Sequence, residues 1–250
     1  MSKQSAASRG GNHLYTPPKG TDKTMTETPG ASKRQALKTP RAAAIAGIIF
    51  SILYGTSMVL INLSLPHEST AFLAWLETDV QTITLALNLI PFAGIAFLWF
   101  IGVIRDLLSD MEDRLFSTVF LGSGLLFLAL TFIGAALAGG LLSSYAIDSN
   151  ILVQSGVLTY SRRVIYHVFN IYAIRMAGVF MISLASIWLR TRVMHRSWAF
   201  LTYALALVLL LSIYYTMWVT LIFPGWVLVV SVYILIRNLH NQPREDIREV

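Results

Sequence analysis

Few residues in this 250-residue sequence have both the type and the placement needed for chemistry, and Arg175 is the most informative of them. It interrupts an apolar run, AIRMAGVFMISLASIWLR, of the kind that lies in membranes. A charged side chain within a bilayer usually faces the protein interior or a water-filled cavity, where it can contact an anion or a substrate. Arginine can instead extend to the membrane surface or form a structural ion pair. Both a cavity contact and a structural role are therefore open for Arg175.

Five polar residues are candidate partners of Arg175, namely Asp148, Glu77, Asp79, Asn62 and Asn88. Asn88 also precedes Pro91 in the run LALNLIPFAGIAF. Proline removes a backbone hydrogen bond and kinks a helix, and a kink beside an amide is a common hinge or ion-contact geometry in transporters. Isolated prolines are equally routine in membrane helices. The pattern predicts a hinge at Pro91 with cavity contacts at Asn88 and Asn62, or a purely structural kink.

The sequence contains no arrangement typical of an enzyme or a metal site. The segment Arg105–Arg114 (RDLLSDMEDR) has four acids and two arginines, which could bind a cation but is more typical of a solvated loop with internal ion pairs. The five histidines are scattered without metal-ligand spacing. No nucleotide-binding, HExxH or GxSxG motif is present. We therefore expect no catalytic residue, no cofactor and no metal.

Small residues follow a more regular pattern. Along the first apolar run they recur at every fourth position, at Ala43, Gly47, Ser51 and Gly55. The third run has the same spacing in three successive pairs, which are Gly134 and Ala138, Ala135 and Gly139, and Ala136 and Gly140. Such faces allow helices to approach closely. The pattern predicts tight internal helix contacts or a dimer interface.

The elements that carry all these residues must lie in lipid. Hydrophobic residues make up 55% of the chain and charged residues 13%, and the mean hydropathy is +0.63. A typical soluble domain has about 25% charged residues. The absence of cysteine excludes disulfides and thiolate metal sites. The composition predicts an all-α integral membrane protein.

Apolar runs long enough to cross a bilayer predict a six-helix bundle. The helices are expected at about 42–65, 83–104, 117–142, 168–189, 198–214 and 218–236. The last two come from one stretch of 39 residues without a charge, Trp198–Ile236, which is too long for a single crossing. We place the turn near Tyr214–Trp218, which leaves Pro224 inside the sixth helix.

Positive charges predict the orientation of the bundle. With the N-terminus in the cytoplasm, the inner segments hold 16 of the 19 Lys and Arg residues, whereas the outer segments hold only Arg162 and Arg163. Both termini are therefore expected to be cytoplasmic, with 237–250 as a C-terminal tail.

Two of the outer segments are expected to be more than simple loops. In Ser69–Val80 apolar residues recur every four positions, which fits a short helix at the membrane interface or an extension of the second helix. The segment Ser143–His167 is too polar to span the membrane. We expect it to form an ordered extracytoplasmic cap or a substrate entrance.

Residues 1–41 differ from the rest of the chain, being rich in Ser, Thr, Pro and Gly and poor in leucine. They are expected to be disordered, and they lack the apolar region of a secretory signal peptide and the apolar face of a transit peptide. Translation could also start at Met25. The tail holds eight Lys or Arg residues and two acids, which account for the whole net charge of +6. This placement argues for topology and anionic lipid rather than nucleic acid.

Four basic residues of the tail adjoin the first helix: Lys33, Arg34, Lys38 and Arg41. Such clusters attract anionic lipid headgroups, although basic residues beside a helix often only fix its orientation. The lipid bilayer, with anionic lipid at the cytoplasmic face, is thus an expected partner.

Three stretches, GIAFLWFIGVIRD, EDRLFSTVFLGSGLLF and RMAGVFMISLASIWLR, resemble segments of bacterial multi-pass inner-membrane proteins of unassigned function. The resemblance covers the second to fourth helices, about a third of the chain. It implies a location in the bacterial inner membrane but no activity and no site residue.

Three classes of function follow from these patterns. The first is a non-catalytic membrane component that packs with itself or with a partner protein through its small-residue faces. The second is a small-solute or ion transporter or a channel-like protein with Arg175 at a central cavity. The third, a membrane enzyme, has almost no support. The first is preferred because the small residues are regular whereas the polar residues are isolated.

Overall fold

The chain is all-helical in its computed structural model. The structure describes residues 29–64, 71–108, 114–148, 152, 154–191, 196–211 and 217–240. No strand occurs within these ranges. The expected disorder of the tail before residue 29, and the start at Met25, fall outside them.

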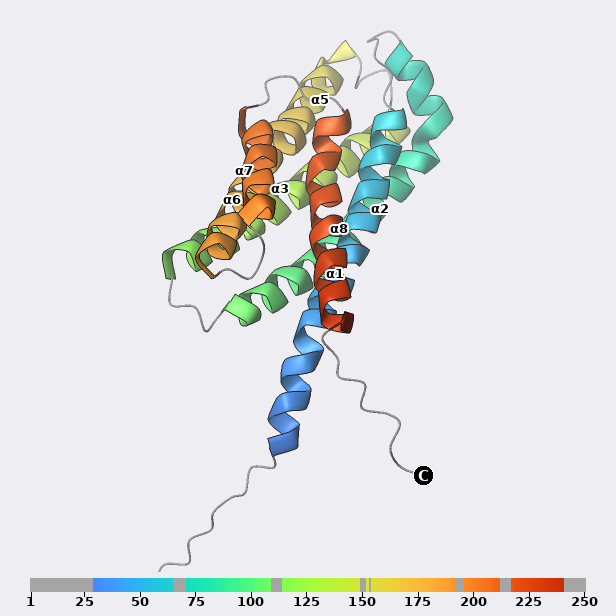
Figure 1. Ribbon diagram of the computed structural model, residues 1–250. Helices are drawn as coiled ribbons and strands as arrows, with labels where there is room; N and C mark the ends of the chain where they lie inside the picture. The colour runs from blue at the N-terminus through green and yellow to red at the C-terminus, as the bar shows by residue number, and fades with distance from the viewer. Residues whose placement is uncertain are drawn as a thin grey trace, which may run out of the picture.

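Figure 1 shows the described helices in chain order, coloured from blue at α1 to red at α8. They are α1 (Pro29–Ser64), α2 (Ala71–Leu108), α3 (Arg114–Ile147), α5 (Val157–His167), the π-helix η1 (Val168–Ala173), α6 (Ile174–Thr191), α7 (Arg196–Leu211) and α8 (Met217–His240). The elements α5, η1 and α6 follow one another without a break, so they form a single long helix with a π-helical middle.

Within the described residues, five segments are long and apolar enough to cross a membrane, as a membrane protein requires. They are Arg41–Ile61, Val80–Arg105, Ser117–Ile147, Val157–Arg190 and Val219–Arg237. The apolar helix α7 is shorter, at 16 residues. Its length of about 24 Å, at 1.5 Å per residue, is less than the roughly 30 Å of hydrocarbon in a bilayer.

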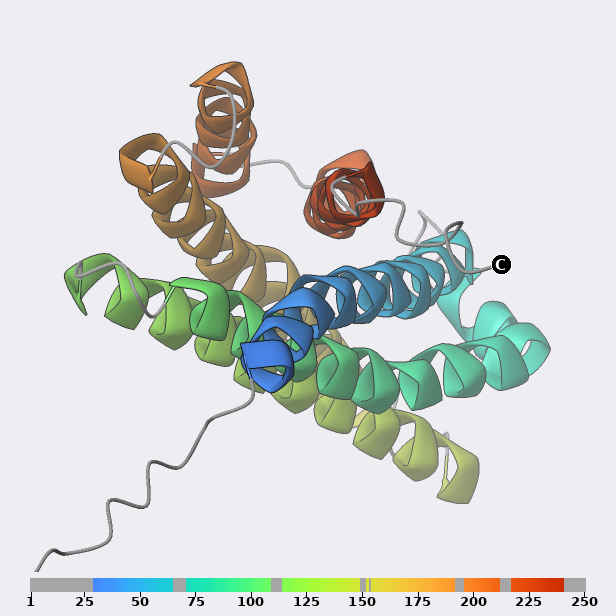
Figure 2. The same ribbon diagram turned by 60° about the horizontal axis from the view of Figure 1, so that its bottom comes forward.

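The helices pack into two connected groups. The helix α1 packs against α2 and α8, whereas α6 packs against α7, and α3 contacts α2, η1 and α6 (Figure 2). The first turn of α1 and the last turn of α8 lie at the same end of the bundle (Figure 1). The helix α7 therefore sits at the edge of the bundle, held mainly by α6.

Several helices extend further than the hydropathy pattern predicts. The helix α2 begins at Ala71, so the described part of Ser69–Val80 is an extension of that helix rather than a separate interface helix. Most of Ser143–His167 is also helical: α3 continues to Ile147, and α5 begins at Val157, directly after Gly156 with its left-handed φ of 72°. A small apolar cluster of Leu152 and Leu158 packs against the end of α3.

The first helix also differs from expectation at its start. Helix α1 begins at Pro29 and therefore includes residues 29–41, which the composition assigned to the disordered tail. In the last helix, Pro224 lies within α8, as expected.

Candidate functional site

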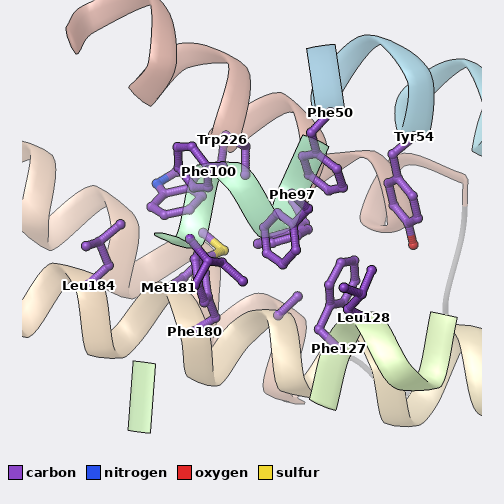
Figure 3. Close-up of a cluster of buried hydrophobic side chains, with 14 of the residues drawn as sticks. Phe50, Tyr54, Phe97, Phe100, Phe127, Leu128, Phe180, Met181, Leu184 and Trp226 are labelled. Carbon is purple, nitrogen blue, oxygen red and sulfur yellow. The ribbon is translucent and has the colours of Figure 1, made fainter. Parts of the chain in front are cut away.

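The centre of the bundle is filled by aromatic rings. The ring of Phe97 in α2 lies 4.6 Å from that of Phe50 in α1, 5.3 Å from Phe127 in α3 and 5.4 Å from Phe180 in α6, between ring centroids. Phe223 of α8 closes the group at 5.8 Å. All five side chains are buried, and Figure 3 shows rings from separate helices converging on one interior. The middle of the described bundle is therefore packed and apolar.

Some polar side chains of the interior bond within their own helix, as Ser51 does to the carbonyl of Gly47, and others join two helices. The hydroxyl of Ser57 in α1 donates a 2.7 Å hydrogen bond to the carbonyl of Ala86 in α2. The hydroxyls of Ser186 in α6 and Tyr203 in α7 lie 2.6 Å apart. Within the described ranges, no three His, Asp or Glu side chains are grouped as in a metal site. The two hydrogen bonds join α1 to α2 and α6 to α7.

Arg175 is the second residue of α6, and its side chain is exposed on the outside of the bundle. Its neighbours Ile174 and Ala177 are buried and fill the interior at that level. No hydrogen bond or ion pair joins Arg175 to any residue that the structure describes. The geometry thus places this arginine on an outward face and not in the aromatic core.

The other predicted cavity residues also lie away from the core. Asn88 and Pro91 are both exposed on α2, where Ile90 and Ala93 are the residues that face inward. Pro91 lies inside the continuous helix α2. The side chain of Asn62 lies outside the described part of the chain. Arg175 and Asn88 are thus exposed on different helices, and no shared interior site contains them.

The small residues of α1 lie at close helix contacts. Ala43, Gly47 and Ser51 are buried. A Cβ atom at Gly47 would collide with Ser231 of α8 and would lie 2.9 Å from the ring of Phe100 in α2. Gly47 therefore allows α1 to fit between these two helices. Gly55, the last member of the pattern, is only partly buried and has open space around it.

The small residues of α3 divide in the same way. Gly134 is buried, and a Cβ atom there would lie 2.6 Å from the ring of Phe169 in η1. Ala138 is partly buried, whereas Gly140 is exposed with nothing within 4 Å of its Cβ position. Only part of the small-residue pattern in α3 is accordingly explained by contacts inside the bundle.

The basic cluster before the first span is described only in part. The side chains of Lys33, Arg34 and Lys38 lie outside the described part. Arg41 is partly buried, and its Nε atom is buried without a hydrogen-bond partner in the described ranges. Binding of lipid headgroups by these residues remains a prediction.

No pattern in the sequence predicts the π-helix η1. Its six residues, VFNIYA, contain neither Gly nor Pro. The structure places the hydroxyl of Thr220 in α8 at 3.5 Å from Oδ1 of Asn170, to which it donates. Around η1, three basic residues are exposed at Arg163, His167 and Arg175. No sequence motif marks these three residues, and their shared exposure is visible only in the structure.

The chain matches no protein-family model, and no curated protein or solved structure is significantly similar to it.

Proposed function

We propose that this protein is a non-catalytic, multi-pass membrane component that packs with itself or with a partner protein through the exposed face of α3. The observation that carries the proposal is the poor burial of this helix. In the most apolar stretch of α3 only 22% is buried, against 39% or more in the other four spans. A membrane helix with so little internal contact has most of its surface free for lipid or protein.

That free surface carries large apolar residues such as Leu126 and Ile133, and it also includes a row of small ones. Gly122, Ala129, Ala136 and Ser143 recur every seven positions, which keeps them near one face of a helix. The last three are exposed, and Gly140 beside them is exposed as well. Glycine costs a helix about 1 kcal/mol relative to alanine. An exposed glycine with no internal contact is thus better explained by close packing against a second helix.

We also propose a membrane topology for the chain. It crosses an inner membrane six times, with α7 as the fifth crossing, and both termini lie in the cytoplasm. The concentration of Lys and Arg in the segments next to the two ends supports this orientation. The anionic lipid of the cytoplasmic leaflet would contact the basic cluster before α1. The transport alternative has less support, because the exposed Arg175 does not line the aromatic core.

Cysteine cross-linking tests the proposed surface. Because the chain has no native cysteine, each single-cysteine variant has one thiol at a known position. Ala136→Cys and Gly140→Cys introduce thiols on the exposed face of α3. Leu85→Cys, on an exposed position of α2, is the matched control. After mild oxidation in membranes, we expect a cross-linked product of twice the chain mass, or one with a specific partner, at the two α3 positions only.

Two results would contradict the proposal. One is the absence of any cross-linked product at both α3 positions although the thiols react with a small maleimide. The other is an equal yield at Leu85→Cys, since random collision in the membrane would then explain the products.

A further inference from the structure

One face of the long helix α5–η1–α6 carries exposed basic and aromatic residues. Arg163, His167 and Arg175 are exposed, and Ile171 between them is partly buried. Tyr160, one turn before Arg163, is 72% exposed, and Tyr172 is 56% exposed. These residues differ in character from the apolar side chains that cover most of the remaining outer surface.

The π-helix aligns the basic residues. Positions 163, 167, 171 and 175 are spaced by four residues, and in a regular α-helix each such step overshoots a full turn by about 40°. Three steps would therefore turn Arg175 about 120° away from Arg163. The wider turn of η1 accommodates additional residues and cancels most of that rotation. The exposure of all three basic side chains agrees with a common face.

The depth of Arg175 suits a contact with a lipid headgroup. Arg190 lies near the other end of the same span, 15 residues away, or about 22 Å along the helix. Since the hydrocarbon layer is about 30 Å thick, Arg175 lies roughly 8 Å inside its far edge. An arginine side chain can extend over that distance to the headgroups. Arg163 and His167 lie further along the helix in the same direction, at and beyond the membrane edge.

The short helix α7 ends beside the same position. A Cβ atom at Gly178 would lie 3.1 Å from Leu210 and 3.2 Å from the carbonyl oxygen of Ala206. The last turn of α7, which ends at Leu211, is therefore level with Arg175 in the antiparallel α6.

We infer that this face binds a phosphate-bearing lipid in the leaflet on the side opposite the chain termini. The Arg175 guanidinium contacts the phosphate with paired N–H donors, and Arg163 adds positive charge further out. His167 donates its Nδ1–H to the carbonyl of Arg163 at 2.7 Å, which orients the imidazole ring along its own helix. The exposed tyrosines occupy the interfacial position that aromatic residues favour. The inference is independent of the assembly surface on α3.

Native mass spectrometry of the full chain in mild detergent tests the site, with phosphatidylglycerol as the titrated lipid. The variant Arg175→Gln is expected to lose about tenfold in affinity, which corresponds to one charge-assisted hydrogen bond, and Arg163→Gln is expected to lose less. The control Arg105→Gln removes an exposed arginine in the last turn of α2 and should leave this binding unchanged. A galactosyl diacylglycerol with the same acyl chains should bind wild type and Arg175→Gln equally.

Two further measurements distinguish a lipid phosphate from free phosphate and a loss of binding from a loss of folding. Inorganic phosphate at millimolar concentration should not displace the lipid; displacement, with binding of phosphate alone, would overturn the assignment to a lipid. If Arg175→Gln folds poorly, Arg175→Lys replaces it, and its retained charge should preserve more binding than neutral substitutions. Equal phosphatidylglycerol binding by wild type and the neutral variant overturns the inference.

Discussion

The indole Nε1 of Trp226 in α8 donates a hydrogen bond of 3.0 Å to Oγ1 of Thr202 in α7. The Thr202 hydroxyl in turn donates to the carbonyl oxygen of Trp198 at 2.9 Å, so it acts as acceptor and donor at once. Both Trp226 and Thr202 are buried. Because α7 is held mainly by α6, this bond is a specific connection between the edge helix and the rest of the bundle.

Removing the acceptor should therefore destabilise the fold. Thr202→Val keeps the side-chain volume but leaves the buried indole N–H without a partner, and we expect the free energy of unfolding to fall by about 1–2 kcal/mol. Thr84→Val is the control, because Thr84 is exposed and its hydroxyl bonds only to the carbonyl of Val80 in its own helix. Denaturation in mild detergent, followed by tryptophan fluorescence, measures both. Equal losses in the two variants would show that the connection between α7 and α8 contributes nothing specific.

The two glycines of the small-residue pattern in α1 should respond oppositely to the same substitution. Gly47→Ala forces a Cβ atom against Ser231 and Phe100, and we expect a loss of about 1–3 kcal/mol in the free energy of unfolding. Gly55→Ala adds a Cβ atom in open space and should stabilise the helix by up to about 1 kcal/mol. Thermal denaturation of both purified variants distinguishes them. A stabilising Gly47→Ala would refute the close packing of α1 against α8.

The aromatic core should depend on Phe97 more than on any phenylalanine of the outer surface. Phe97 is fully buried, whereas Phe92 in the same helix is 62% exposed. Truncation of Phe97 to alanine is expected to cost about 3–5 kcal/mol because it leaves a cavity between five helices. Phe92→Ala should cost under about 1 kcal/mol. The yield and thermal stability of the detergent-solubilised variants give the comparison, and similar losses at both positions would contradict the central place of Phe97.

The location of the membrane helices follows from hydropathy, because lipid requires long uncharged segments whatever else the protein does. Gly47 was predictable for a related reason, since close helix contacts in lipid select small residues. The helical extensions were predictable only in part, because the extension of the second helix was one of two alternatives whereas a helix at 157–167 was not expected. Residues 71–80 and 157–167 are amphipathic or polar, and a stretch of that kind forms a helix or a loop according to the packing around it.

The orientation of Arg175 was beyond sequence analysis for a different reason. The helix α6 is apolar on nearly every face, so periodicity shows which residues share a side with Arg175 but not which side faces inward. The π-helix η1 also rotates α6 relative to α5, and no residue type in the sequence predicts this rotation. The face that combines Arg163, His167 and Arg175 therefore becomes visible only in three dimensions.

Single-molecule photobleaching in liposomes tests the proposed assembly most directly. The full chain, labelled at one site, is reconstituted at increasing ratios of lipid to protein. We predict that the fraction of two-step bleaching stays above the value for random co-occupancy in wild type and falls to that value in the double variant Ala136→Phe, Gly140→Leu. The control Gly102→Leu changes an exposed glycine of α2 with open space around it and should behave like wild type. Random co-occupancy in wild type at every dilution would contradict self-association through α3.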